Sequence, residues 1–312
     1  MTASRTHETP VGPPVGRPIA GRYLLLDPIA RGGMSSVWRA WDLRERRHVA
    51  AKVLARVEGD LLLRFVQEQA TRVDHPQVLP PIGWAADDDR VLLVMELVRG
   101  GSVETLTRDH GRPLHPSLVA GLLDQLLAAL AAVHAAGIVH RDVKPANLLL
   151  DPASSGVPRL RLADFGVAVR IDAPRLTSAP GLVGTDGYLA PEVGAGARPA
   201  PAQDLYAAGV VAGVMLGRPA TAGADVDAGP LGELVTLLTA PDPDQRLADA
   251  ETARALLARV DLPPVPPGLV VPDRLGPDPA PPAQRDWVTA AAVLGSAAAV
   301  TVAGIALRLS TG

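Results

Sequence analysis

Apolar and polar residues follow one another in patterns that predict both strands and helices. Residues 49–52 alternate in the way a half-buried strand does, and residues 91–98 form an apolar run, interrupted by one glutamate, that is typical of a buried strand leading into a linker. Residues 59–72 and residues 118–136 repeat apolar side chains at helical spacing, the second over a longer span. The pattern therefore predicts strands in the first third of the chain and a long amphipathic helix after it.

The last fifty residues have a different character. Residues 262–286 contain nine prolines, which are too many for a helix and predict an extended, poorly ordered linker. The following stretch, 287–307, carries no charged residue and is long enough to cross the hydrocarbon core of a bilayer. Trp287 is placed for the membrane interface, with Arg285 on the inner side and Arg308 at the outer edge. The alternative is an alanine-rich helix buried in or docked on a protein surface.

Composition narrows the classes of function. The net charge is −3, so the basic surface that nucleic-acid binding needs is absent. The chain has no cysteine, which excludes disulfides and cysteine metal sites. The first eighteen residues are polar and contain prolines, so we expect a disordered leader and no signal peptide.

One stretch carries a recognisable chemistry. His140-Arg141-Asp142 is followed by Lys144 and Asn147, and Asp164-Phe165-Gly166 begins twenty-two residues after Asp142. A carboxylate at Asp142 could take the proton of a substrate hydroxyl, and Lys144 would place a positive charge beside a transferring phosphoryl group. The amide oxygen of Asn147 and the carboxylate of Asp164 could hold two Mg²⁺ ions. Each residue alone would usually be a turn or cap residue, but the ordered series predicts a phosphoryl-transfer site.

These motifs resemble those of a bacterial serine/threonine protein kinase of the eukaryotic-like (Hanks) type, over roughly residues 23–260. Residues 29–37 contain a glycine pair between two apolar segments, where this family has its glycine-rich loop over the ATP phosphates. Residues 49–52 then end in Lys52, which the family uses to hold the α- and β-phosphates. The alternatives are an ordinary turn for the glycine pair and an unpaired surface position for the lysine.

The resemblance implies the members of an ATP site. The loop over the phosphates would comprise Ile29, Ala30, Gly32, Gly33, Met34 and Ser35. The adenine ring would lie between the apolar side chains of Val37, Ala50 and Leu149. Met95 would be the gatekeeper of the hinge, and the backbone from Glu96 to Val98 would meet the adenine edge. Each of these apolar residues could equally belong to a core that needs no ligand.

Glu68, within the expected helix 59–72, would form the ion pair that fixes Lys52 on the nucleotide. The alternative is an exposed helix carboxylate. Two departures from the family pattern stand out in this lobe. Ala30 and Ser35 occupy positions where glycine is usual, and the chain between Glu68 and His75 is about two residues shorter than usual.

The resemblance also implies an activation segment that runs from Asp164 to Ala190-Pro191-Glu192. Thr185 would hydrogen-bond near Asp142 and Lys144, which favours serine or threonine acceptors over tyrosine. Thr177 and Ser178 lie in the variable middle of the segment, where a phosphate could pair with Arg141 and order the segment.

Two further residues would be structural. Asp204 resembles the buried aspartate that braces the catalytic loop, and Arg246 resembles the arginine that pairs with Glu192. The region between Asp204 and Arg246 is shorter than usual by a few tens of residues. We therefore expect a helical lobe whose C-terminal part is reduced.

The expected fold is α+β, a two-lobed protein-kinase-like architecture with a β-rich N-lobe, a mainly helical C-lobe and ATP in the cleft between them. The domain boundaries that we expect are a disordered leader at 1–18, a kinase domain at 19–260 divided after residue 97, a proline-rich juxtamembrane linker at 261–286, a transmembrane helix at 287–308 and a short outer tail at 309–312.

The predicted activity is transfer of the γ-phosphoryl group of Mg·ATP, with Mn²⁺ as an alternative metal, to serine or threonine of the chain itself and of other proteins. The chain would be a single-pass cell-membrane protein with a cytoplasmic kinase domain. Small residues recur every four positions in the membrane stretch and permit a homodimer there, namely Ala291, Gly295, Ala299 and Ala303. A nucleotide-binding pseudokinase or scaffold is the alternative function, and a small-molecule kinase is a third hypothesis that would not account for Thr185 or Ala190-Pro191-Glu192.

Overall fold

The computed structural model describes residues 17–31, 35–55, 73–87, 90–110, 113–165, 168–170, 185, 187–220 and 229–280. The described residues form two units. One contains residues 17–55, 85–94 and 277–280, and the other contains residues 73–84 and those described between 95 and 276. The expected leader, the Glu68 helix, the middle of the activation segment and the transmembrane helix lie outside the described residues.

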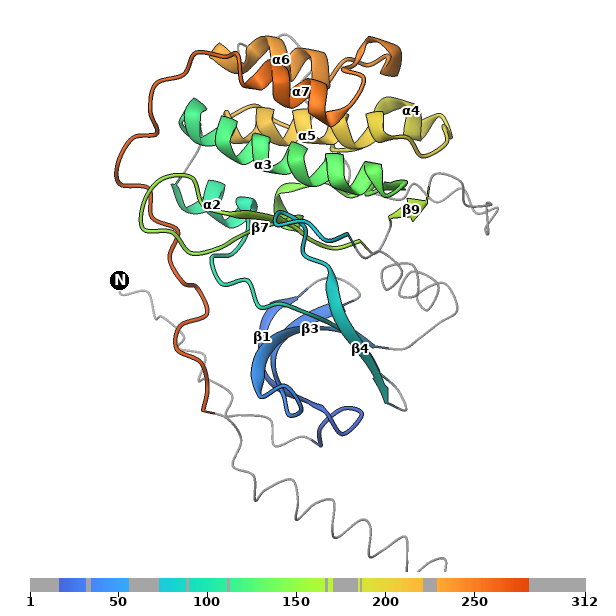
Figure 1. The fold of residues 1–312 in the computed structure, drawn as a ribbon, viewed down its shortest axis with the longest axis vertical. Helices are drawn as coiled ribbons and strands as arrows, with labels where there is room; N and C mark the ends of the chain where they lie inside the picture. The colour runs from blue at the N-terminus through green and yellow to red at the C-terminus, as the bar shows by residue number, and fades with distance from the viewer. Residues whose placement is uncertain are drawn as a thin grey trace, which may run out of the picture. The chain divides into compact units, whose positions relative to one another are not determined.

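The strands of the first unit belong to a five-stranded sheet in the order β1-β2-β3-β5-β4 (Figure 1), of which residues 81–84 and Met95 are counted with the second unit. β1 pairs antiparallel with β2, and β2 pairs antiparallel with β3. The strands are β1 (Tyr23–Arg31), β2 (Ser35–Asp42), β3 (Arg47–Ala55), β4 (Pro81–Asp87) and β5 (Arg90–Met95). The strand predicted at residues 49–52 is confirmed as part of β3, in which Val49, Ala50 and Ala51 are all buried and Lys52 is half-buried.

Charged side chains lie along the β1 to β3 part of this sheet. The Arg39 guanidinium donates two hydrogen bonds to the carboxylate of Asp27, at 2.8 and 3.0 Å. Residues 277–280 belong to the same unit, and Asp278 of this short segment lies 3.3 Å from Arg39 and 3.5 Å from His48. Asp42, which is buried, accepts hydrogen bonds at 3.0 and 2.7 Å from Arg22. These charged side chains are therefore paired with one another and with a residue of the chain's later part.

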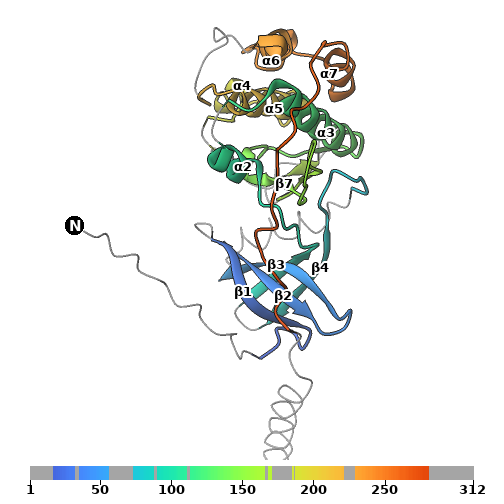
Figure 2. The ribbon, with the colours of Figure 1, turned by 90° about the vertical axis from the view of Figure 1, so that its left-hand side faces the viewer.

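The second unit is mainly helical, and the two units together confirm the predicted α+β kinase-like fold. In both views α3 and α5 lie side by side, with α6 and α7 beyond them (Figures 1 and 2). The helices are α2 (Val103–His110), α3 (Pro116–Ala135), α4 (Pro191–Gly194), α5 (Pro201–Met215), α6 (Gly232–Leu238) and α7 (Ala250–Leu257). Their buried leucines, valines and alanines form one continuous core.

The long helix predicted at residues 118–136 is α3, at the centre of this core. It begins with Pro116 after the N-cap residue His115, whose ring nitrogen accepts a hydrogen bond from the amide of Ser117 at 3.3 Å. Within the part of the chain that the structure describes, α3 is the one helix with the length and apolar composition of a membrane span, at a mean hydropathy of 1.7. Half of this apolar stretch is buried inside the structure, so its apolar side chains form part of the core of the second unit.

Short strands and turns of the second unit carry the predicted motifs. β6 (Ile138–Val139) pairs with β9 (Val169–Arg170), and β7 (Leu148–Leu150) pairs antiparallel with β8 (Leu160–Leu162). A 3₁₀ turn, η1 (Pro145–Asn147), joins directly onto β7. The loop between β6 and β7 is thus fixed at both ends by strand pairing.

The segment after α7 differs from the sequence-based expectation. We expected a poorly ordered linker from residue 261 onward, but residues 262–276 pack against the second unit. Leu262, Val265 and Leu269 contact its core, and Val271 is only 3% exposed. The prolines exclude regular structure over this stretch, whereas the apolar residues between them supply the buried surface that holds it in place.

Arg246 and Glu192 form the ion pair that the sequence predicted. Their hydrogen bonds measure 2.7 and 2.8 Å, and the arginine side chain is 0% exposed. The Arg246 guanidinium also donates to the carbonyl oxygens of Ala202, Ala240 and Pro241. One side chain therefore ties the start of α4 to α5 and to the turn before η3 (Pro243–Gln245).

Replacing Arg246 by methionine should lower the free energy of unfolding by about 3–5 kcal/mol, because the Glu192 carboxylate would remain partly buried without its partner. Denaturant unfolding of the two proteins measures the difference. Arg254→Met is the matched control: its ion pair with Asp124 is 2.9 Å long but its side chain is 33% exposed, so we expect a loss of about 0–1 kcal/mol. Equal losses in the two variants would contradict the structural role of Arg246.

Candidate active site

A buried carboxylate anchors the loop between β6 and β7. Asp204, in the first turn of α5, is 1% exposed and accepts hydrogen bonds of 2.8 Å from the backbone amides of His140 and Arg141. It also contacts the ring nitrogen Nε2 of His134, at the end of α3, at 2.8 Å. Burial alone would raise the pKa of Asp204, but the hydrogen bonds from the His134 ring and the His140 amide hold that pKa below its ordinary value.

His140 is fully buried between this anchor and the end of β8. Its Nδ1 accepts a hydrogen bond from the amide of Asp142 at 3.3 Å, and its Nε2 lies 3.2 Å from the carbonyl oxygen of Ala163. Nδ1 is an acceptor here, so Nε2 carries the proton and donates to Ala163. Burial lowers the pKa of His140, which agrees with this neutral form. The ring also meets Phe165 edge-on, with centroids 4.7 Å apart.

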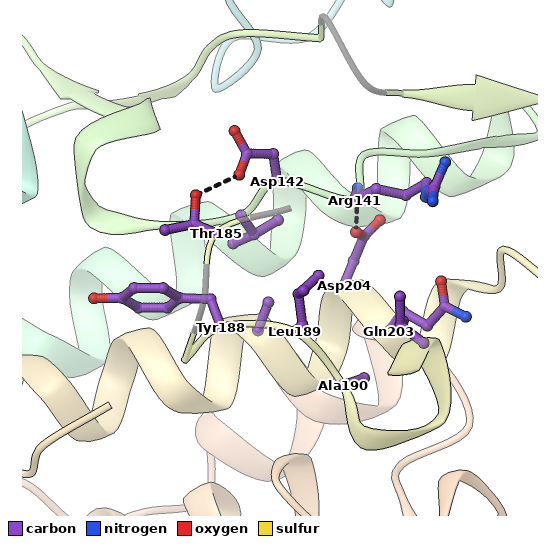
Figure 3. Close-up of a pocket in the computed structure, with 11 residues that line it drawn as sticks. Arg141, Asp142, Thr185, Tyr188, Leu189, Ala190, Gln203 and Asp204 are labelled. Carbon is purple, nitrogen blue, oxygen red and sulfur yellow. Dashed lines mark hydrogen bonds between the residues drawn. The ribbon is translucent and has the colours of Figure 1, made fainter. Parts of the chain in front are cut away.

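The carboxylate of Asp142 receives three side-chain donors. Lys144 Nζ and Asn147 Nδ2 lie 2.8 and 2.9 Å from Oδ2, and the Thr185 hydroxyl donates to Oδ1 at 3.0 Å. Thr185 in turn accepts a hydrogen bond from Lys144 at 2.8 Å. Figure 3 shows Thr185 directed at Asp142 and the Arg141 amide directed at Asp204. The contact of Thr185 with Asp142 and Lys144 is the one that the sequence predicted, and it fixes the orientation of the carboxylate.

Asn147 and Asp164, the predicted metal ligands, are brought together by the β7–β8 pairing. Leu148 lies opposite Leu162, and the amide of Ala163 donates to the carbonyl oxygen of Asn147 at 2.9 Å. The side-chain nitrogen of Asn147 is committed to Asp142, so its oxygen is the atom of that amide that suits a cation. Oxygen ligands of this kind fit Mg²⁺. In the described part of the chain, no group of three histidine or acidic side chains forms another candidate metal site.

Two residues of this site have a backbone conformation that is uncommon for side chains other than glycine. Arg141 has φ +66° and Asp164 has φ +67°. Each such residue costs about 1–3 kcal/mol and persists only where the surroundings determine it. For Arg141 the surroundings are the hydrogen bond from its amide to Asp204. Strain of this kind concentrates at functional sites, and here it occurs in the residue before Asp142 and in Asp164, one of the predicted metal ligands.

The predicted phosphate and adenine residues of the first unit share one face of its sheet. Val37 lies opposite both Ala30 of β1 and Lys52 of β3, and Ala50 is two residues before Lys52 on the same strand. Residues directly opposite in a sheet, or two apart along a strand, point to the same side. Ile29 and Ser35 border this group at the end of β1 and the start of β2.

The predicted hinge begins where β5 ends at Met95, and residues 96–98 have no regular structure. The side chain of Glu96 accepts two hydrogen bonds from Arg161 of β8, at 2.7 and 3.1 Å. Arg161 lies opposite Leu149 of β7, which places one predicted adenine contact beside the hinge glutamate. We did not predict the role of Arg161, because no local pattern signals a partner sixty-five residues away.

Several predicted site residues cannot be placed. Gly32, Gly33 and Met34 of the phosphate loop, Glu68, and the activation-segment residues Thr177 and Ser178 lie outside the described residues. Their assignments therefore remain predictions.

Comparison with known proteins agrees with this geometry. The protein kinase domain family matches residues 23–229, which is more than half of the chain. The chain belongs to the protein kinase family. Protein kinases generally use ATP and a divalent metal, in agreement with the predicted cofactors.

Three relatives that match this kinase domain are bacterial proteins. It is 41% identical over 209 residues to serine/threonine-protein kinase PkaB and 37% identical over 214 residues to serine/threonine-protein kinase PkaA, both of Streptomyces coelicolor. It is 33% identical over 202 residues to serine/threonine-protein kinase PrkC of Bacillus subtilis. The matches cover 62% to 63% of this chain but only 49%, 38% and 30% of the respective relatives. The likeness is therefore one of kinase domains and not of whole proteins.

Asp204→Asn should loosen the catalytic loop without unfolding the kinase domain. The amides of His140 and Arg141 would lose their charged acceptor, which corresponds to about 1–3 kcal/mol of local stability and to amide hydrogen exchange about 10–100 times faster. Hydrogen exchange measured by NMR or mass spectrometry over residues 138–143 tests this. Asp249→Asn, at the exposed N-cap of α7, is the control. Unchanged exchange at both loop amides would contradict the anchoring role of Asp204.

Proposed function

We propose that the chain is an active serine/threonine protein kinase that transfers the γ-phosphoryl group of Mg·ATP to hydroxyl groups of itself and of other proteins. The observation that supports this most is the convergence of Lys144, Asn147 and Thr185 on the carboxylate of Asp142. A structural aspartate needs no lysine and no threonine from a segment forty-three residues away.

Asp142 would act as the base. Its carboxylate orients the acceptor hydroxyl and takes up the proton as the oxygen becomes a nucleophile. Lys144, held at 2.8 Å from both Asp142 and Thr185, would stabilise the negative charge that develops on the transferred group. Thr185 would hold the side chains of Asp142 and Lys144 in position relative to each other.

Bound Mg·ATP would supply the phosphoryl group, with Mn²⁺ as an alternative metal. Asn147 and Asp164 would hold the metal through their oxygens. Lys52, paired with Glu68, would hold the α- and β-phosphates, and residues 29–35 would cover them. The backbone of residues 96–98 would bind the adenine edge, with Val37, Ala50 and Leu149 on its two faces.

The acceptor would be a peptide. A pocket beside Asp142 is lined by Tyr188 and Leu189, from the segment after Thr185, and by Gln203 at the start of α5 (Figure 3). The segment that lines this pocket would contact the peptide next to the acceptor residue. The small-molecule alternative needs no such segment, and the scaffold alternative needs no base with three positioned donors. Regulation through a phosphate on Thr177 or Ser178, paired with Arg141, forms part of the same proposal.

Asp142→Asn should lower the rate of phosphate incorporation from labelled Mg·ATP into a serine- or threonine-containing peptide by about 10²–10⁴-fold, because the general base is lost. Asp124→Asn is the control, since Asp124 is a half-buried residue of α3 that is paired with Arg254. The control should stay within about twofold of the natural chain. Nucleotide binding without incorporation in the natural chain would favour the scaffold function instead.

We also propose that residues 287–308 anchor the chain in the cell membrane with the kinase domain in the cytoplasm. The support is the absence of charge between residues 287 and 307 and the flanking Arg285 and Arg308. The full chain should remain with membranes after an alkaline wash, and a chain that ends at residue 280 should not. Equal release of both chains would refute the anchor, and equal retention would assign membrane binding to another part of the molecule.

A further inference from the structure

The segment that follows α7 returns to the part of the second unit that carries the predicted hinge. It runs beside α2 and β7 in both views (Figures 1 and 2). Residues 269–276 of this segment, here called the C-terminal strap, contact two sites far away in the sequence. These are residues 99–101, immediately after the hinge, and Ala153, which follows β7. All of these residues lie within the second unit.

Backbone hydrogen bonds and one buried side chain dock the C-terminal strap. Val271 and Ala153 exchange two hydrogen bonds, at 2.8 and 2.9 Å, as an isolated antiparallel bridge. The amide of Arg274 donates to the carbonyl oxygen of Arg99 at 2.8 Å. Val271, at 3% exposure, packs with the core of the unit. Backbone hydrogen bonds and a buried apolar side chain therefore hold the strap in place, which a loosely attached linker would not show.

Charged side chains connect the strap and the post-hinge segment in both directions. Arg99 donates to the carboxylate of Asp273 at 2.7 Å and also to the carbonyl oxygen of Gly276. Arg274 donates to the carbonyl oxygen of Gly100 at 3.1 Å and also forms an ion pair with Asp109 of α2. The strap and the post-hinge segment therefore each contribute an arginine that donates hydrogen bonds to the other segment.

Two consecutive glycines allow this close approach. A Cβ atom on Gly100 would collide with the carbonyl oxygen of Leu150 and lie 2.8 Å from Cγ1 of Val271. Gly101 has φ +83°, and a Cβ atom there would lie 2.7 Å from Cδ of Arg274. The post-hinge segment is therefore shaped to receive the strap as well as to turn.

We propose that the C-terminal strap is a positioning element of the nucleotide site. Residues 96–98, whose backbone is proposed to bind adenine, lie between two restraints: Arg161 holds the side chain of Glu96, and the strap holds residues 99–101. With both ends fixed, the hinge amide and carbonyl groups are oriented before the nucleotide arrives. This inference rests on the proposed function, and it concerns residues that lie beyond the family match at residue 229.

Loss of the strap should have different effects depending on whether the strap only stabilises the fold or also positions the hinge. If the strap only adds stability, its loss should lower the unfolding temperature and leave the kinetic constants of the folded protein unchanged. If it positions the hinge, its loss should weaken nucleotide binding in the ground state and the transition state alike, which raises KM for ATP and leaves kcat unchanged.

The experiment uses the full chain in detergent, with Asp273→Ala, Arg99→Asp, and the charge exchange Arg99→Asp with Asp273→Arg. Asp261→Ala, an exposed position just before the apolar part of the segment, is the control. Direct titration with ADP and steady-state kinetics with a serine-containing peptide are measured on each. We expect KM for ATP and the dissociation constant of ADP to rise about tenfold in the single variants, with kcat and KM for the peptide within about twofold.

The charge exchange should restore nucleotide affinity toward that of the natural chain, and Asp261→Ala should match the natural chain. Val271→Ser removes the apolar contact and leaves the charged side chains in place. It should raise KM for ATP and the dissociation constant of ADP to a similar extent, because the strap is no longer docked. Unchanged ADP affinity in folded Asp273→Ala and Val271→Ser proteins would overturn the proposal while the kinase activity stands. A natural chain that neither binds ADP nor phosphorylates the peptide would overturn the proposed function and this inference together.

Discussion

The buried carboxylate of Asp204 organises the catalytic loop, because it fixes the backbone of the loop immediately before Asp142. Two consecutive backbone amides, those of His140 and Arg141, donate to its two oxygens, and His134 brings the end of α3 to the same group. The hydrogen bond from the Arg141 amide to Asp204 stabilises the left-handed conformation of Arg141. Asp142 follows directly, and its orientation depends on where the preceding two residues are held. The helical core thus sets the position of the proposed base through one side chain.

From this anchor, a second set of contacts extends to the predicted metal ligands. The neutral ring of His140 joins the amide of Asp142 to the carbonyl oxygen of Ala163. Asp164 comes next in the chain, and Asn147 lies across the β7–β8 pair. One continuous network therefore links α5, the catalytic loop and the residue before Phe165. Because every member of the network is hydrogen-bonded, the loss of one member would leave a buried polar group unsatisfied.

Sequence alone could predict the parts of this structure that local chemistry dictates. The strand at residues 49–52, the apolar periodicity of α3 and the spacing of Asp142, Asn147 and Asp164 all have causes within a short stretch of sequence, and the described geometry agrees with them. The family resemblance added long-range pairs such as Glu192 with Arg246. Neither source could show that Arg161 holds Glu96, since an arginine on a strand reads as a solvent-facing residue.

The C-terminal strap was missed for a related reason. Prolines show which backbone hydrogen bonds a segment cannot make, but they do not show whether its remaining groups find partners. Val271 and Arg274 look unremarkable in the sequence, and their contacts involve residues more than one hundred positions earlier. Docking of an extended segment depends on a surface that exists only after the helices have packed. Here it was therefore visible only in three dimensions.

The position of the core leucines has a practical meaning for anyone who produces this protein in parts. The family match stops at residue 229, yet Leu231, Leu234, Leu238 and Leu257 are all buried in the same core as α3 and α5. A recombinant fragment cut at the edge of the match would expose the apolar surface that these side chains cover, and it would be prone to aggregate. The family match therefore ends at least two helices, α6 and α7, before the end of the part of the chain that the core needs.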